Sequence, residues 1–324
     1  MIIKNDIIYN YNMDIPFDLL KLVASFLVEP RMKLLDWINI DKISPSYLAS
    51  NPCNGAIRLL EQIEPDLDGI HWINISMNPC EYAIHLLEEH PRQEVPASAL
   101  AYNPNALHIL ELFPPKSYNW LGLSENPNAI QMLAANPDEI NWMLLSKNPN
   151  LLNALHLLEK YPDKINWFCL SENPQAIQML TANPNKISWY SLSKNPNAIH
   201  MLEQNMDKID WTMLSTNPNA LHLLEANLDK INWKMLSDNT NPRAIQLLET
   251  VVLNAISLKK PIDDIIDLYY LSRNPSAIKL LEIIAQNNDN SVDWIMLSTN
   301  PSIFEIDTLQ YNIDINNKAN NINC

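Results

Sequence analysis

The chain has 324 residues, 47% of them hydrophobic, and its 37 acidic and 22 basic residues give a formal net charge of −15. This apolar content argues against a mostly disordered chain. The acidic balance argues against a nucleic-acid backbone or an anionic membrane surface as the main ligand, because both need clustered lysine and arginine. We therefore expect no nucleic-acid partner and no membrane partner.

The sequence also predicts a cytoplasmic protein without a cofactor. The N-terminus carries acidic residues and lacks a small-residue cleavage site, and no stretch reaches the roughly 18 consecutive apolar residues of a membrane span. The four cysteines, Cys53, Cys80, Cys169 and Cys324, are scattered and form no CxxC pair, as expected of a reducing compartment. The three glycines form no phosphate-binding loop.

Residues 1–29 precede the repeated part of the chain and contain the stretch DIPFDLLKLVASFL at 14–27. Its apolar spacing predicts an amphipathic helix. An array of repeats needs a covered end, so we interpret this segment as a helix that caps the first repeat.

Residues 30–305 repeat one pattern, in which Asn-Pro recurs at steps of about 22–27 residues. Its asparagines are Asn51, Asn78, Asn103, Asn126, Asn148, Asn173, Asn195, Asn217, Asn241, Asn274 and Asn300. Eight of the nine tryptophans fall at one place in it: Trp72, Trp120, Trp142, Trp167, Trp189, Trp211, Trp233 and Trp294. A period of this length is typical of an all-α solenoid built from short helix–turn–helix units.

Each unit is predicted to contain two short helices. In the unit that starts at Asn126, this residue is the expected N-cap of the first helix, with Pro127 at the first helical position. Asn141 is the expected N-cap of the second helix, which Trp142 begins. Helices this short need packed neighbours, so we interpret the tryptophans as core anchors.

Several units depart from the pattern. Pro45, Ala97 and Leu268 stand at the tryptophan position, and an insertion between Glu249 and Arg273 lengthens one unit. Such an insertion is either a tolerated loop or a recognition element. The tail, residues 306–324, is rich in asparagine and is predicted to be a C-terminal cap or a disordered tail.

Two columns of residues vary along the array. The first lies in the first helix, opposite its apolar arc, and we expect it to be solvated and paired with an acid one turn later in the same helix. It comprises Arg58, His85, His108, Gln131, His156, Gln178, His200, His222, Gln246 and Lys279. Histidines on adjacent repeats would lie near 10 Å apart, too far to share a zinc ion, so no metal site is expected.

The second column directly follows the tryptophan position and is our candidate partner-binding surface. It comprises Ile73, Leu121, Met143, Phe168, Tyr190, Thr212, Lys234 and Ile295. Core positions rarely accept lysine and threonine beside phenylalanine, so the column is expected to be at least partly exposed, as a strip that binds protein. The alternative is that these residues pack against the next unit.

No catalytic site is expected. Serines and carboxylates are copied in every unit, whereas a catalytic constellation is normally unique in a chain, and no Ser/His/Asp or Cys/His group stands apart. We predict a protein that is not an enzyme.

The unit INWxxLSxNPNAIxLLExNPDK resembles the tandem-repeat proteins of giant DNA viruses, the mimivirus relatives, over nearly the whole chain from residue 30. Members of that group are largely uncharacterised, so the resemblance implies architecture and a viral origin more than an activity. It would place the protein in the host cytoplasm, and a place in the virion stays open.

The stretch 14–27 also resembles the opening helix of an F-box, through Pro16, Leu19, Leu20, Val23, Phe26 and Leu27. In that family the helix docks on a Skp1-like adaptor, and the following repeats hold a substrate for ubiquitination. The later helices of an F-box are not visible in this sequence.

Three functional hypotheses follow from the sequence. The first is a non-enzymatic scaffold that binds a protein along one solenoid face, as a viral factor engaging a host component. The second is an F-box-like substrate adaptor of a ubiquitin ligase, and the third is a structural virion component.

Overall fold

The computed structural model describes residues 16–90, 95–288 and 291–322, and these form two compact units. Unit 1 combines the N-terminal flank up to Leu35 with the C-terminal flank from Phe304, and unit 2 spans Asp36–Ile303. Within the described residues the secondary structure is helical apart from two three-residue strands, both in unit 1. The predicted all-α fold of repeated short helices is confirmed.

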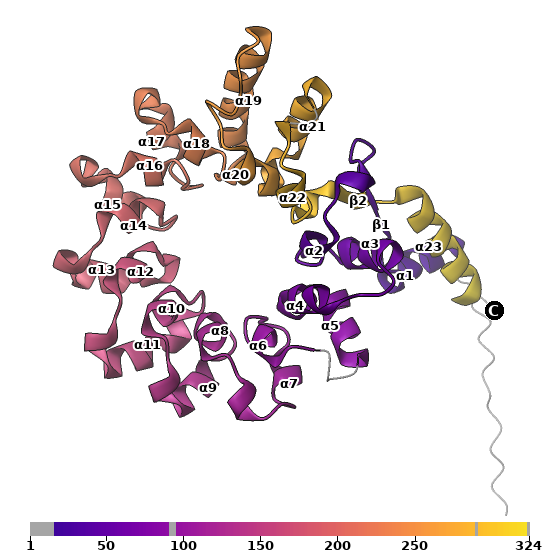
Figure 1. Ribbon diagram of the computed structural model, residues 1–324, viewed down its shortest axis with the longest axis horizontal. Coiled ribbons are helices and arrows are strands. Elements are labelled where there is room, and N and C mark those ends of the chain that lie inside the picture. Colours follow the sequence, from indigo (N-terminus) through magenta and orange to yellow (C-terminus); the bar gives the residue numbers. More distant parts are fainter. Residues whose placement is uncertain (1–15, 91–94, 289–290, 323–324) are drawn as a thin grey trace, which may run out of the picture. The chain divides into compact units, whose positions relative to one another are not determined.

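Unit 2 is a series of helix pairs, and its repeats follow one another around a circle (Figure 1). The helices that contain the tryptophan position, as their first residue in all but α4, lie on the inside, and we call them inner helices. They are α2 (Pro45–Leu48), α4 (Gly69–Met77), α6 (Ala97–Leu100), α8 (Trp120–Glu125), α10 (Trp142–Lys147), α12 (Trp167–Glu172), α14 (Trp189–Lys194), α16 (Trp211–Leu214), α18 (Trp233–Leu236), α20 (Leu268–Arg273) and α22 (Trp294–Leu297).

The outer helices follow the asparagine of each repeat. They are α3 (Asn54–Ile63), α5 (Glu81–Glu89), α7 (Leu107–Leu110), α9 (Ile130–Ala135), α11 (Leu151–Lys160), α13 (Ile177–Ala182), α15 (Ile199–Glu203), α17 (Leu221–Glu225), α19 (Pro242–Ser257) and α21 (Ile278–Asn287). The core between the layers consists mainly of leucine, isoleucine and alanine, such as Leu133, Leu145 and Leu158, which are fully buried.

Short turns of 3-10 helix connect the layers. They are η1 (Ile40–Lys42), η2 (Pro115–Ser117), η3 (Pro137–Glu139), η4 (Pro162–Lys164), η5 (Pro174–Ala176), η6 (Pro184–Lys186), η7 (Met206–Lys208), η8 (Leu228–Lys230), η9 (Pro275–Ala277) and η11 (Pro301–Ile303). Proline begins most of them, because its fixed φ suits the first position of such a turn and its missing N–H costs nothing there.

The predicted start of the inner helices is confirmed, whereas that of the outer helices is wrong in the unit where we placed it. Asn141 caps α10 by accepting a hydrogen bond from the Leu144 N–H, and Trp142 is the first helical residue. Asn126 does not cap α9, which begins at Ile130. Its side-chain oxygen instead accepts the N–H of Asn128 and closes a turn.

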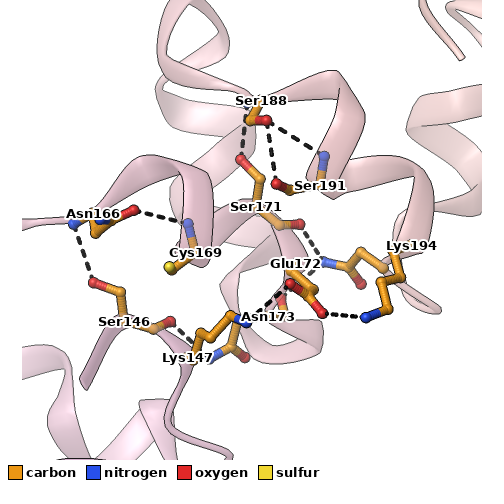
Figure 2. Close-up of polar contacts among 11 residues, drawn as sticks. Ser146, Lys147, Asn166, Cys169, Ser171, Glu172, Asn173, Ser188, Ser191 and Lys194 are labelled. Carbon is orange, nitrogen blue, oxygen red and sulfur yellow. Dashed lines mark hydrogen bonds and ion pairs between the residues drawn. The ribbon is translucent and has the colours of Figure 1, made fainter. Parts of the chain in front are cut away.

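The reason is that the side-chain amide of the repeat asparagine donates its hydrogen bonds to the preceding repeat. The buried Asn173 donates from its amide nitrogen to the carbonyl oxygen of Ser146, at 3.1 Å (Figure 2). It also donates to the carbonyl oxygen of Asn148, at 2.9 Å. Its own carbonyl in turn accepts from Asn195. One amide group thus joins two repeats and fills both of its donor positions.

This pattern, which we call the asparagine ladder, runs through every repeat of the described chain. Its members are Asn51, Asn78, Asn103, Asn126, Asn148, Asn173, Asn195, Asn217, Asn239, Asn274 and Asn300, and each is buried. Each side-chain oxygen accepts the N–H two residues on.

One member of the predicted repeat register is wrong. We aligned the unit at 239–242 on Asn241 because proline follows it, but Asn239 occupies the ladder. Asn241 instead matches the second asparagine of the Asn-Pro-Asn units, and its amide donates to the Pro218 carbonyl at 2.7 Å. The ladder needs the asparagine at the correct step, and proline at the next position is dispensable.

The ladder closes on itself. Asn51, in the first repeat, donates to the carbonyl oxygens of Ser298 and Asn300, in the last repeat, both at 2.9 Å. The Ser44 N–H donates to the Ser298 hydroxyl, and the Lys42 ammonium lies 5.1 Å from the centre of the Trp294 ring. The same kinds of contact join consecutive repeats elsewhere, so the first and last repeats meet as ordinary neighbours. Sequence periodicity did not predict this closure.

A second set of bonds uses the serine that stands two residues before every ladder asparagine except Asn51 and Asn103, where alanine takes its place. Ser146 and Ser171 accept the N–H of Asn166 and Ser188, which cap the next inner helices (Figure 2). Both hydroxyls also donate to the tryptophan carbonyl four residues earlier. Ser76 is an exception. The residue that caps the next inner helix is Pro96, which has no N–H to donate, and the Ser76 hydroxyl oxygen is left without a hydrogen-bond partner.

Unit 1 pairs the two flanks of the array. Strand β1 (Met32–Leu34) runs antiparallel to β2 (Phe304–Ile306), with Lys33 opposite Glu305. Helix α1 (Phe17–Leu27) packs on α23 (Thr308–Ile322) through buried Leu20, Ala24 and Ala319. The C-terminal segment, predicted to be a cap or a disordered tail, is helical from Thr308 to Ile322.

The insertion after Glu249 extends an outer helix and forms no separate lobe. Helix α19 continues to Ser257, and Lys259 then adopts a positive φ of 53°. The Lys260 N–H bonds back to the Ala255 carbonyl, which is the usual way to close a helix C-terminus. Among the described residues, no helix combines the length and apolar character required to cross a membrane.

We expect the ladder to control stability. Asn173→Ala should lower the free energy of unfolding by about 2–4 kcal/mol, because it leaves two buried carbonyl groups without a hydrogen-bond donor. Asn173→Asp should cost at least as much, since a carboxylate oxygen would then face two carbonyl oxygens. Urea denaturation followed by circular dichroism measures both changes.

The matched control is Asn128→Ala, because Asn128 also bonds across repeats, to the Pro104 carbonyl, but is exposed. Its loss should stay below about 1 kcal/mol. Equal losses at Asn128 and Asn173 would contradict the central role of the buried ladder.

Candidate functional site

The eight residues predicted as a partner-binding surface all lie on inner helices, and all are exposed. The six apolar ones, Ile73, Leu121, Met143, Phe168, Tyr190 and Ile295, expose between 46% and 53% of their surface. Thr212 and Lys234 are exposed as well. The column is therefore not buried against the next unit, although Phe168 contacts Tyr190 of the following repeat. We call the column, together with Tyr269, the inner strip.

Helix geometry explains the exposure. On α10, Leu145 and Ser146 are buried, and Leu145 lies in the core between the layers. Met143 and Lys147, four residues apart, therefore share the opposite face. The same spacing places Phe168 beside Glu172 and Tyr190 beside Lys194, so α10, α12 and α14 each present one strip residue and one charged residue a turn later.

Tyr269 is a member of the strip that we missed. It is 47% exposed and follows Leu268, which replaces the tryptophan in its unit. Leu268 stands at the tryptophan position of its unit, and this alone is a sufficient signal to assign the next residue to the column. Arg273 lies one turn later, 5.7 Å from the Tyr269 ring and 5.0 Å from the Tyr270 ring.

The strip is continuous where its apolar character is strongest. Phe168 and Tyr190, on neighbouring inner helices, stack with ring centres 6.0 Å apart and an angle of 20° between the ring planes. Leu121 and Met143 precede them on α8 and α10. Four consecutive repeats thus expose a large apolar side chain at the same place.

A charged cluster borders this stretch. The Glu172 carboxylate lies between Lys194, at 2.9 Å, and Lys147, at 3.3 Å (Figure 2). Burial raises the pKa of Glu172, but the hydrogen bonds and positive charges of Lys194 and Lys147 outweigh it, so its pKa lies below the ordinary value. Glu172 therefore stays ionised and links three consecutive inner helices.

The tryptophans are less buried than we predicted. Trp72 is 4% exposed, but those that begin α8, α10, α12, α14, α16, α18 and α22 are half-buried. Their place at the helix start leaves one side of the ring open, and lysines of the connecting turns cover it in part. Lys208 lies 4.6 Å from the Trp189 ring and Lys230 lies 4.5 Å from the Trp211 ring.

The histidines of the first column are solvated, as predicted, but their pairing follows the prediction only in part. We predicted pairing with an acid one turn later in the same helix, and His85 lies 3.8 Å from Glu89 in this way. His108 instead pairs with Glu88 of the preceding repeat at 2.8 Å, and His222 pairs with Glu203 at 2.9 Å. The side chains reach across the joint between repeats, because equivalent positions of adjacent helices are close there.

The side chains that could bind a metal ion do not cluster in the part of the chain that the structure describes. No group of three or more His, Cys, Asp or Glu side chains within it could hold a metal ion. Burial raises the pKa of the Cys80 and Cys169 thiols, which disfavours the reactive thiolate.

The six residues that resemble an F-box helix divide between two faces of α1 and its N-cap. Leu20 is 2% exposed and packs in the core of unit 1, so it is not available to an adaptor. Leu19, Val23, Phe26 and Leu27 are exposed, Phe26 by 81%, and Pro16 is the exposed N-cap. Leu22, which we did not select, is 54% exposed and extends this second face.

No family model, no curated protein and no solved structure matches this chain.

The Glu172 cluster predicts a defined pH dependence. Glu172→Gln should lower the free energy of unfolding at pH 7 by up to about 1 kcal/mol, since the side chain is largely buried and pairs with two lysines. A lowered pKa in the folded state gives stability that is complete above the ordinary value of 4.5 and is lost as the pH falls through the lowered value. The difference between wild type and variant should therefore shrink below pH 4.5.

Urea denaturation at a series of pH values measures this difference. Glu125→Gln is the control, because Glu125 occupies the same position on α8 and makes no ion pair within the described residues. Its effect at pH 7 should be smaller. A Glu172→Gln effect that is constant from pH 7 to pH 3 would contradict the role of the two lysines.

Proposed function

We propose that the protein is a non-enzymatic repeat scaffold that binds a segment of another protein along the inner strip. The observation that carries this proposal is the run of exposed apolar side chains Leu121, Met143, Phe168 and Tyr190 on consecutive inner helices. Exposed aromatic residues and methionine are enriched in protein interfaces, where they supply most of the binding energy. In keeping with the resemblance to giant-virus repeat proteins, the partner would be a host component.

The scaffold supports this role by holding the strip residues in place. Most of them, Met143, Phe168 and Tyr190 included, stand on a short helix whose preceding cap and following asparagine are bonded to the preceding repeat, as Asn166 and Asn173 are around Phe168. A surface fixed in this way loses little conformational entropy when a partner binds.

A photo-crosslinking amino acid at Tyr190 should capture a discrete partner in cells that naturally contain the protein. The same group at His200 is the control, because His200 is exposed on the outer helix of the same repeat. Electrophoresis and mass spectrometry of the adducts are the measurement.

The Tyr190 adduct should disappear with Phe168→Asp, because a carboxylate in the middle of an apolar contact must be desolvated. Equal adducts from Tyr190 and His200, or an adduct that survives Phe168→Asp, would refute binding along the strip.

A second candidate is an F-box-like adaptor function, in which α1 docks on a Skp1-like protein. The observation that favours it is the exposed apolar face of α1 formed by Leu19, Leu22, Val23 and Phe26. These residues follow the i, i+3, i+4, i+7 spacing of a helix that inserts into an apolar groove.

Co-purification with a Skp1-like protein tests this candidate. Leu19→Asp together with Phe26→Asp should abolish recovery of the adaptor without unfolding unit 1, since both side chains are exposed. Leu20→Asp is unsuitable, because it places a charge in the core beside Ala319. Failure of the wild-type protein to recover the adaptor would eliminate the candidate.

A further inference from the structure

The exposed face of the inner helices differs in charge from the rest of the molecule. Two positions of each repeat lie on this exposed face, away from the core between the layers: the strip position and the position four residues later. Their charged residues are four basic, Lys147, Lys194, Lys234 and Arg273, and three acidic, Glu125, Glu172 and Asp238. A protein with a net charge of −15 therefore has one face with a small positive excess.

The excess is concentrated between α10 and α20, where four basic residues accompany two acidic ones. Both acids are already paired. Glu172 is shared by Lys147 and Lys194, and Asp238 bonds to Arg273 at 2.9 Å. Lys234 stands in the strip itself and makes no ion pair within the described part of the chain.

Between α10 and α18 the strip therefore changes character, from apolar at Met143, Phe168 and Tyr190, through Thr212, to cationic at Lys234. A segment lying across it would meet the apolar side chains with Lys147 and Lys194 beside them, and the Lys234 ammonium at the far end. The outer helices carry recurrent acids such as Glu203 and Glu225, so an acidic segment would meet more negative charge there than along the strip.

Resting on the proposed function, we propose that the partner segment is acidic and extended, with aspartate or glutamate alongside large apolar residues. Its apolar side chains contact Met143, Phe168 and Tyr190, and its carboxylates contact Lys194 and Lys234. Neighbouring helices lie about 8–10 Å apart and an extended chain rises about 3.3 Å per residue. A segment that spans α10 to α18 thus needs about ten residues.

A random 12-residue peptide library displayed on phage, selected against the full chain, tests this proposal. The selected peptides should be enriched in acidic residues together with phenylalanine, leucine or tryptophan. A synthetic copy of the most abundant peptide should bind with a Kd that rises at least tenfold with Lys234→Glu, and the affinity should fall with added salt. Lys279→Glu, the matched reversal on an outer helix, should leave the Kd unchanged within twofold.

The variants separate the two proposals. If Phe168→Ser/Tyr190→Ser abolishes binding but Lys234→Glu does not change it, the strip binds protein and the acidic partner is refuted. Selection of basic or uncharged peptides also refutes it. If binding is insensitive to Phe168→Ser/Tyr190→Ser, both proposals fail. Concentration-dependent dimers that compete with the peptide would identify a second copy of this chain as the occupant and would equally overturn an acidic segment.

Discussion

The structure of unit 2 depends on one chemical group, the buried side-chain amide of asparagine. An asparagine amide has two donor hydrogens and an acceptor oxygen. At each step of the ladder the two hydrogens reach carbonyl oxygens of the preceding repeat, and the oxygen closes the turn that starts the next outer segment. Aspartate lacks the donors and glutamine adds a methylene, so neither can replace it in this geometry.

The hydrogen bonds to the repeat asparagines and serines solve a problem that short helices create. A helix of four to six residues leaves most of its terminal N–H and C=O groups without partners, and burying them is costly. In unit 2 the asparagines take up carbonyls at the ends of the inner helices, and the serines take up N–H groups at their starts. Each repeat therefore supplies hydrogen-bond partners for the backbone groups of its neighbour, and apolar packing between the layers adds to the stability.

Much of this fold could be predicted from the sequence, because the local rules are strong. The asparagine before Trp142 and the asparagine after Lys147 mark both ends of α10. The exposure of the strip could be inferred because threonine and lysine share a column with phenylalanine. Asn239 was missed because proline was treated as part of the signal, and Tyr269 because its unit has no tryptophan.

Other features had no signal in the sequence. The periodicity fixes contacts between neighbours, but the curvature that brings Asn51 to Asn300 is the sum of small rotations that no single unit encodes. The cross-repeat pairing of His108 with Glu88 likewise depends on how adjacent outer helices are staggered. The sequence carries only indirect information about the partner of the strip, namely the balance of charged residues on the exposed face of the inner helices.

The closed ladder also limits how the gene could change. An open array can gain or lose a unit at little cost, because each repeat contacts only its neighbours. Here an extra unit would have to fit a circle that is already complete, or else part Asn51 from the carbonyls of Ser298 and Asn300. Duplication and deletion of whole units, the usual source of variety in repeat proteins, would therefore be selected against, and diversity would arise instead within units, as in the lengthened α19.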